Sequence, residues 1–230
     1  MKEVLFSYYS IFLHPFKGHD FLRAVRLGEK ASLTGPLKEW QFWDGDGPLR
    51  ENSFIENMGI SWTFIIIRSF YTIMGIHIGL YLYTRFDFSG DSLPFMMSGK
   101  SFNAESLTLF FLLLESVFAP LSLWLFTRVW AVFIRFFTIL YETEEEDIEG
   151  AISQIVNSGL SSHLCLLIPV VGTLVQFFSS QVLIFAGLKR NLKFSTLQSL
   201  LVLGAPYILV IMLMLFSMIT FMMALINILS

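Results

Sequence analysis

Four long runs of apolar residues, separated by short polar segments, dominate this sequence. They cover residues 60–83, 105–141, 151–188 and 195–228. A helix needs about 20 predominantly apolar residues to cross a bilayer, and every run reaches that length. Hydrophobic residues make up 55% of the 230 residues and charged residues only 14%, so a soluble domain of this length could not bury the apolar surface in one core. The sequence therefore predicts an all-α, polytopic membrane helix bundle rather than a soluble or disordered protein.

The third run decides the number of crossings, because Pro169 and Gly172 interrupt it. As one helix it gives four crossings, and as a hairpin that turns at these residues it gives two short spans and five crossings. Cytoplasmic segments of membrane proteins are rich in Lys and Arg. Such residues are frequent in residues 1–58 and recur as the cluster 189–193, and five crossings place both on the cytoplasmic side. We therefore expect an N-terminus in the cytoplasm, a C-terminus outside and five transmembrane helices, at about 60–83, 105–127, 151–168, 172–188 and 197–228.

The chain divides into a cytoplasmic or interfacial N-terminal segment, residues 1–58, and a membrane domain, residues 59–230. The apolar stretch Val4–Leu13 favours a helix with two placements open, on the cytoplasmic face of the bilayer or packed against the bundle. The second apolar run is too long for one span, and its Arg128 and Arg135 are typical of the headgroup region. We expect this helix to continue past the membrane and to end near Glu142.

Residues 142–149 form a dense, mostly acidic run. One interpretation is that it recruits a cation or a basic partner. The other is helix capping, since Thr143 and Glu146 have the spacing of a capping box and acidic residues stabilise a helix N-terminus. We expect the capping role, within a solvated loop.

A small set of polar residues falls within the predicted spans, where an unpaired charge is costly. They are Arg68, His77, Glu115, His163, Gln176 and Gln181. A rise of about 1.5 Å per residue puts Arg68 and Glu115 close to the middle of a core about 30 Å thick, so an ion pair between them is predicted. We expect His163 to bond to the backbone. Gln176 and Gln181 are consistent with interhelical hydrogen bonds or with a hydrated cavity.

Four further residues are predicted to act in helix packing. Pro169 and Gly172 form the expected turn. Gly75 and Gly79 form a Gly-x-x-x-Gly motif in an apolar helix. This motif allows a second helix to approach closely, either inside the bundle or in a dimer.

No catalytic, cofactor-binding or metal-ligating residues are predicted. The histidines lack the His-Glu-x-x-His spacing of a zinc protease, and the sequence has no Gly-rich phosphate-binding motif. Cys165 is the single cysteine, which excludes an intramolecular disulfide and a cysteine metal cluster. The net charge of −3 argues against nucleic-acid binding.

Three segments in the last third of the chain carry a family resemblance. Small polar residues at 161–163 lead into an apolar run that ends at Pro169 and Gly172, residues 182–190 end in Gly-Leu plus bases, and Ser195 starts the last helix. In these features residues 105–228 resemble the Yip1-domain family of polytopic membrane proteins, in particular its bacterial-type members. Residues 14–16, His-Pro-Phe, are similar to the Pro-aromatic segment ahead of their first span. The resemblance implies five spans, a cytoplasmic N-terminus and no catalytic centre.

The expected function is that of a multi-pass scaffold or interaction protein in membrane organisation or trafficking, in the cytoplasmic membrane if the source is bacterial. Its expected partners are other membrane proteins and lipids, and a homo-oligomer is compatible with the sequence. The alternative is a small transporter or permease subunit. Its midplane site would lie beside the helix broken at residues 169–172 and would use Arg68, His77, Glu115, Gln176 and Gln181.

Overall fold

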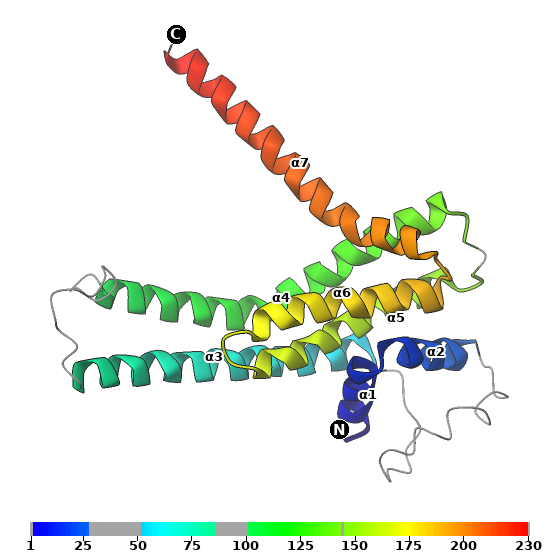
Figure 1. Ribbon diagram of the computed structural model, residues 1–230, viewed down its shortest axis with the longest axis horizontal. Helices are drawn as coiled ribbons and strands as arrows, with labels where there is room; N and C mark the ends of the chain where they lie inside the picture. Colours follow the sequence, from blue (N-terminus) through cyan, green and yellow to red (C-terminus); the bar gives the residue numbers. More distant parts are fainter. Residues whose placement is uncertain (1, 28–51, 86–100, 144, 230) are drawn as a thin grey trace.

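The structure is a computed structural model that describes residues 2–27, 52–85, 101–143 and 145–229. Within these residues the chain is all-α, as the sequence predicts (Figure 1). Its elements in chain order are α1 (Lys2–Leu13), α2 (Pro15–Arg26), α3 (Phe54–Arg85), α4 (Ser101–Leu140), α5 (Ile148–Gly159), η4 (Leu160–Leu167), α6 (Gly172–Asn191) and α7 (Thr196–Leu229). The element η4 is a 3₁₀ helix that follows α5 without a break.

A helical hairpin lies at the centre of the molecule. Its first arm is α5 with η4, its second arm is α6, and the turn between them falls at residues 169–172, as predicted (Figure 1). Gly172 is required there, because a Cβ atom at this position would lie 2.5 Å from the carbonyl oxygen of Cys165. Val170, at the tip, has a φ of 67° and a side chain that is 100% exposed. The tight turn therefore points an apolar side chain away from the protein.

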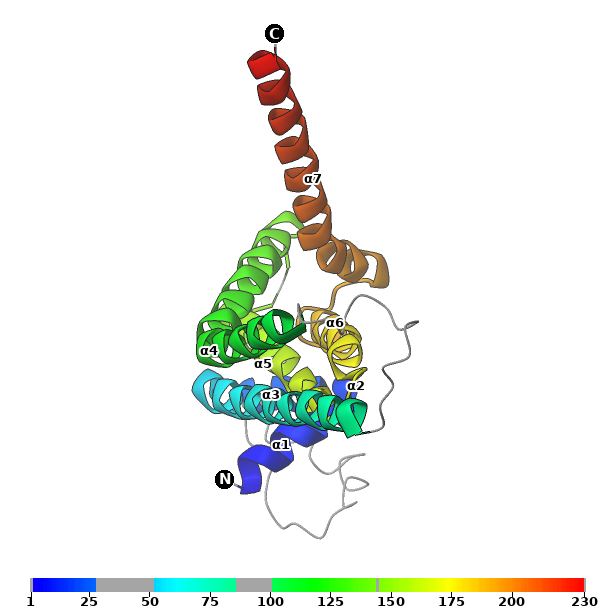
Figure 2. The same cartoon turned by 90° about the vertical axis from the view of Figure 1, so that its left-hand side faces the viewer.

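Every other described helix packs against this hairpin. α2 lies along α6, α3 along η4 and α4 along α5, while the N-terminal part of α7 contacts α6 (Figures 1 and 2). The core between them includes Ile155, Leu160 and Ile184, which are completely buried. α1 joins this core through Tyr8, whose hydroxyl donates a hydrogen bond to the carbonyl oxygen of Leu160. Of the two placements left open for the first helix, packing against the bundle is the one observed.

Among the described residues, three helices are long and apolar enough to cross a membrane. The qualifying stretches are Phe54–Gly79 of α3, Leu107–Leu140 of α4 and Thr196–Met223 of α7. Most of their side chains face away from the protein, and the C-terminal part of α7 stands clear of the other helices (Figure 2). The two remaining predicted crossings correspond to the arms of the hairpin, and these are not confirmed as spans.

The tip of the hairpin reaches only about half-way along α3 (Figure 1). Tyr71, near the middle of α3, donates a hydrogen bond from its hydroxyl to the carbonyl oxygen of Leu166, close to the turn. The following turns of α3 extend beyond the hairpin. The hairpin therefore ends well short of the far end of α3.

α4 is a single helix from Ser101 to Leu140 that ends just before Glu142. It bends part-way along (Figure 1), and it contains Pro120, a residue type that removes a backbone hydrogen bond and bends helices. The predicted continuation of this helix through Arg128 and Arg135 is confirmed, because the stretch does not turn back as a separate helix.

Replacing Gly187 with alanine should destabilise the protein. A Cβ atom at this position of α6 would lie 2.8 Å from both His19 Cε1 and Ile155 Cγ1, and both of these side chains are fully buried. Overpacking of this kind costs about 1–3 kcal/mol.

The control is Gly204→Ala in α7, where the nearest atom, Ile208 Cδ1, lies 4.0 Å away and alanine should be neutral or stabilising. Thermal unfolding in detergent measures both variants. Equal melting temperatures would contradict the packing of α2 on α6.

Candidate functional site

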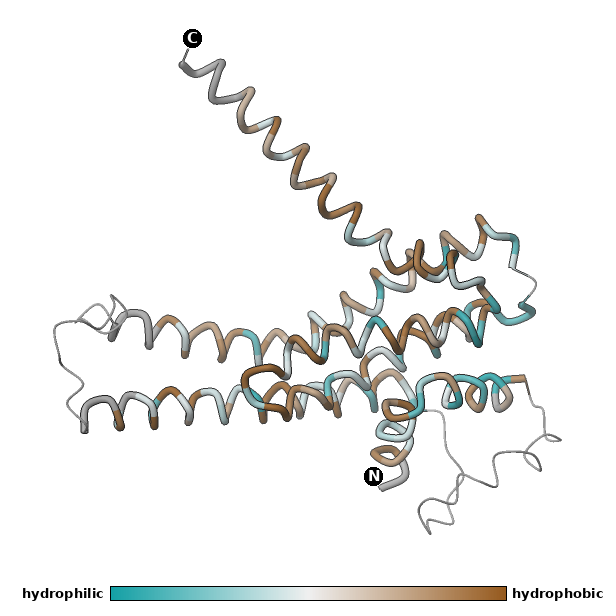
Figure 3. The backbone as a smooth tube through the Cα atoms, in the orientation of Figure 1, coloured by the Kyte–Doolittle hydropathy of each residue, from teal (hydrophilic) through white to brown (hydrophobic). Residues whose placement is uncertain are grey.

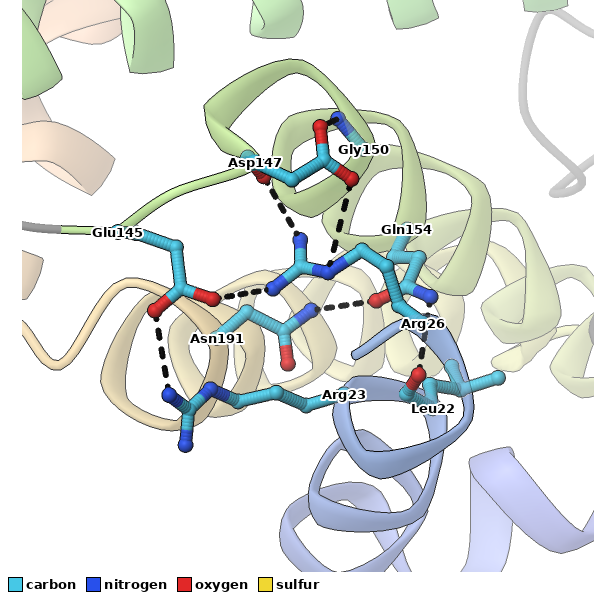
Figure 4. Close-up of polar contacts among 8 residues, drawn as sticks. All are labelled: Leu22, Arg23, Arg26, Glu145, Asp147, Gly150, Gln154 and Asn191. Atoms are coloured by element: carbon cyan, nitrogen blue, oxygen red, sulfur yellow. Dashed lines mark hydrogen bonds and ion pairs between the residues drawn. The ribbon is translucent and has the colours of Figure 1, made fainter. Parts of the chain in front are cut away.

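Hydrophilic residues are concentrated at one end of the molecule, on α2 and around the neighbouring ends of α5 and α6 (Figure 3). Here the last turn of α2 meets the acidic run (Figure 4). Nη2 of Arg26 donates to Oε1 of Glu145 at 2.7 Å, and Nη2 of Arg23 donates to Oε2 at 3.2 Å. The side chain of Glu145 is only 4% exposed and that of Arg26 only 7%. The acidic run thus finds a basic partner within its own chain, in a nearly buried ion network.

The same network orders the start of α5. Nη1 of Arg26 donates to the backbone oxygen of Asp147 at 3.1 Å, and Oδ1 of Asp147 accepts a hydrogen bond from the N–H of Gly150 at 2.9 Å. Asp147 is therefore the N-cap of α5. The predicted capping role of the acidic run is confirmed, whereas the expectation of a solvated loop fails at Glu145, whose side chain is nearly buried. The prediction that Thr143 is the capping residue is wrong, because the helix begins only at Ile148.

Neutral side chains continue this network into the hairpin (Figure 4). Nε2 of Gln154 donates to the carbonyl oxygen of Leu22 at 3.0 Å, and Nδ2 of Asn191 donates to Oε1 of Gln154 at 3.4 Å. Because buried polar groups need hydrogen-bond partners, these contacts tie α2, α5 and α6 together. Sequence reasoning misses this network. The sequence feature that could have indicated it is the pair of arginines, Arg23 and Arg26, in a chain that is otherwise poor in charge.

His19 and Ser158 form a second buried contact below the network. Nε2 of His19 lies 2.9 Å from Oγ of Ser158 and 3.2 Å from the carbonyl oxygen of Leu183. Burial lowers the pKa of His19 to about 4, because the charged imidazolium is desolvated. His19 is 0% exposed and Ser158 2%, so this pair is closed to a substrate. The pair has a structural role, in holding α2 against α5 and α6.

The predicted contact between Arg68 and Glu115 is confirmed. Nη2 of Arg68 donates to Oε2 of Glu115, which joins α3 to α4. Nη1 of Arg68 donates to Oγ1 of Thr173 at 3.3 Å, which links the first turn of α6 to the ion pair. At the same level Ser116 Oγ donates to Ser69 Oγ at 3.0 Å. This cluster connects three elements through polar contacts at the tip of the hairpin.

The remaining predicted polar residues do not converge on this cluster. Nδ1 of His163 lies 2.8 Å from the carbonyl oxygen of Leu160, which confirms the expected backbone bond. His77 contacts the carbonyl oxygen of Ile73 in its own helix and lies about 13 Å further along α3 than Arg68. Gln176 is half-buried, and Gln181 has a buried carbonyl oxygen with no hydrogen-bond partner in the described part of the chain. Interhelical hydrogen bonding is therefore not confirmed for the two glutamines.

The Gly-x-x-x-Gly motif does not pack inside the bundle. No described atom lies within 4 Å of the place where a Cβ atom would stand on Gly75 or Gly79. The reason is the length of the hairpin, which ends at the level of Tyr71, one turn before the motif. The prediction of close packing within the bundle is wrong for the described residues, and dimerisation through this motif stays a prediction.

The described side chains offer little for metal or nucleophile chemistry. No group of three or more His, Cys, Asp or Glu residues in this part of the chain could hold a metal ion. Cys165 is a free, buried thiol, and Sγ lies 3.5 Å from Oγ of Ser179. What the arrangement does is join helices, at the polar end and at the hairpin tip.

The stability of the protein should fall on acidification because of His19. Its pKa in the folded protein, about 4, lies below the unfolded value of 6.5, so the unfolded chain binds the proton more readily. The contribution of His19 is present above about pH 6.5 and is lost as the pH falls toward 4, at up to about 1.4 kcal/mol per pH unit.

Free energies of unfolding at pH 7 and pH 5 test this expectation. His19→Gln should flatten the dependence, and the exposed His14→Gln should not. If both variants keep the wild-type pH dependence, another group is responsible for it.

The ion pair of Arg68 and Glu115 should appear as an energetic coupling. Arg68→Leu alone leaves a carboxylate without its partner and should destabilise the protein more than the double variant Arg68→Leu, Glu115→Met, because a stranded charge at membrane depth is costly. We expect a coupling free energy of about 0.5–3 kcal/mol in a double-mutant cycle measured by unfolding in detergent. Strict additivity would show that the contact does not stabilise the fold.

Comparison of the chain with protein-family models, with curated proteins and with solved structures finds no match. The resemblance to Yip1-domain proteins rests on the residues alone and stays a prediction. The geometry at the two polar clusters is the basis for the function proposed below.

Proposed function

We propose that this chain is a multi-pass membrane scaffold or interaction protein of Yip1-like type, not an enzyme. The observation that carries the proposal is the ion pair between Arg68 and Glu115. A transport or catalytic site needs polar groups that exchange partners with a substrate. These two charges instead hold each other and Thr173, which ties α3, α4 and the hairpin together.

The polar end of the molecule supports an interaction role. The network of Figure 4 makes α2, the acidic run and the start of α5 one packed unit. On its outside it presents exposed charges of both signs, Glu142, Glu146, Arg190 and Lys193. A folded, charged surface next to membrane-spanning helices suits contact with other membrane proteins.

For the membrane placement, we propose that α3, α4 and α7 cross the bilayer, with the polar end in the cytoplasm and the C-terminus outside. Oδ2 of Asp20 lies 3.7 Å from Nη1 of Arg190, and the guanidinium of Arg190 lies 5.7 Å from the ring centroid of Phe16. The N-terminal helices and the basic end of α6 therefore share one side, and their Lys and Arg residues favour the cytoplasmic side. The connection at residues 86–100, expected outside, lies beyond the described residues.

Two versions of this topology are possible, and they differ in how deeply the hairpin enters the bilayer. The sequence predicts that both arms cross, which gives five spans. The level of its tip beside Tyr71 favours a hairpin that enters from the cytoplasm, turns near mid-depth and returns. Irregular backbone at membrane depth is tolerated where protein covers it, and η4 is covered by α1, α3 and α6. Both versions leave the termini on the same sides and differ only in the depth of Val170.

Cysteine labelling of intact cells measures that depth. In a Cys165→Ala background, Val170→Cys should resist a membrane-impermeant maleimide from both sides. Its side chain is 100% exposed, so no described part of this chain shields it, and the expected protection comes from lipid. Ser92→Cys, in the connection between α3 and α4, should react from outside, and Lys193→Cys only after the cytoplasmic side is opened. Reaction of Val170→Cys from outside would establish the five-span version instead.

The same labelling tests the alternative function, a small transporter or permease subunit. Gln176→Cys and Gln181→Cys should be protected if these positions are packed against helices and lipid. A water-filled pathway through the bundle would make at least one of them reactive in intact cells, and a scaffold role would then be contradicted.

A further inference from the structure

A pocket of about 300 Å³ opens between α4 and α5, beside the start of α3. Its wall includes Trp124 and Arg128 of α4 together with Ser153 and Asn157 of α5. None of the residues of the Arg68 cluster or of the network in Figure 4 lines it. The pocket therefore brings a basic group, an aromatic ring and neutral hydrogen-bonding groups together at a separate place.

Arg128 carries the uncompensated charge of this pocket. Its guanidinium carbon lies 5.6 Å from the centroid of the Trp124 ring, and it forms no ion pair with any described residue. The second arginine of the pocket, Arg135, is neutralised. Its Nε and Nη2 donate to the two carboxylate oxygens of Glu149, at 2.8 and 2.5 Å. Glu149 is the one acidic residue among the described residues that line the pocket, and it is already paired with Arg135. The positive charge of Arg128 is therefore not neutralised within the pocket.

The chemistry of Arg128 fits a phosphate group. A guanidinium that lies over an aromatic ring at cation–π distance still has N–H donors to offer, and two of them match two oxygens of a phosphate. Ser153 and Asn157 face the same pocket from α5 and add neutral donors. A quaternary ammonium group would instead need a free carboxylate or an aromatic cage, and Glu149 is already bonded to Arg135.

The position of Arg128 along α4 fits the headgroup layer. It lies about 13 residues past Glu115, which is about 20 Å along the helix at 1.5 Å per residue and less along the membrane normal, because α4 is bent. With the Arg68–Glu115 pair at mid-depth, the hydrocarbon core ends about 15 Å from it. Leu125 and Leu121 lie about one and two turns before Arg128 on the same side of α4, and they are 55% and 58% exposed. They form an apolar track that leads from Arg128 toward the bilayer centre.

We propose that this pocket binds the headgroup phosphate of an anionic phospholipid from the cytoplasmic leaflet. Arg128 is the principal contact, Ser153 and Asn157 complete the polar wall, and an acyl chain follows Leu125 and Leu121. This inference deepens the proposed function, because it names a lipid class as partner. It rests on the proposed membrane placement, which puts Arg128 in the headgroup layer. Cysteine labelling reports that placement separately, so a failure of the membrane placement and a failure of lipid binding at Arg128 give different results.

Lipid titration of the purified full chain tests the site. Micelles that contain the chain are titrated with phosphatidylglycerol or phosphatidylcholine, and bound lipid is counted by native mass spectrometry. Phosphatidylglycerol should bind in preference. Arg128→Gln should weaken its binding about fivefold, which corresponds to one basic residue at a membrane surface, and Arg128→Lys should restore most of it. The matched control is Lys193→Gln, which removes one exposed charge from the same end of the molecule and should leave the affinity unchanged.

Three results would overturn the proposal. Equal losses in Arg128→Gln and Lys193→Gln would show unspecific attraction of anionic lipid. Equal binding of the two lipids by the wild type would show that the headgroup charge is not recognised. Displacement of phosphatidylglycerol by millimolar inorganic phosphate would assign the pocket to a free anion. Unfolding temperatures without added lipid verify that each variant is folded.

Discussion

Close approach at the glycines of the central hairpin is the constraint on which the other helices depend. A side chain at Gly172 would collide with the backbone of Cys165, and one at Gly187 would collide with His19 and Ile155. Between lipid-facing helices the hydrophobic effect contributes little, so association relies on tight van der Waals contact and interhelical hydrogen bonds. The hairpin supplies both, and α1, α2, α3, α4 and α7 are all arranged around it.

The two polar clusters solve different physical problems. Near the hairpin tip, Arg68 and Glu115 neutralise each other at a level that the proposed topology puts near the bilayer centre, where an isolated charge would be expensive. At the polar end, Arg23 and Arg26 compensate the nearly buried Glu145 and so allow the N-terminal helices to dock on α5 and α6. In both places the charges hold helices in position, which is the physical basis of the proposed scaffold role.

Arg128 stands apart from these clusters because its charge is not matched within the described residues. Its neighbour Arg135 shows what a compensated arginine on the same helix looks like, with both carboxylate oxygens of Glu149 bonded to it. The difference between the two arginines turns an ordinary groove between α4 and α5 into a candidate lipid site. Under the proposed topology, the long, bent α4 contacts α3 at mid-length and offers the proposed lipid site near its C-terminal end.

The sequence by itself determined the features that depend on composition, length and local chemistry. Long apolar runs specify membrane helices, Pro169 and Gly172 specify a turn, and the rise per residue brings Arg68 and Glu115 to one level. Only the tertiary structure decided that Glu145 meets Arg23, which lies 122 residues earlier in the chain, that His19 is buried against Ser158, and that Gly75 and Gly79 lie beyond the hairpin. These outcomes depend on how far the hairpin extends and on which helix docks against it. Packing between distant segments sets both, and no local pattern in the sequence encodes it.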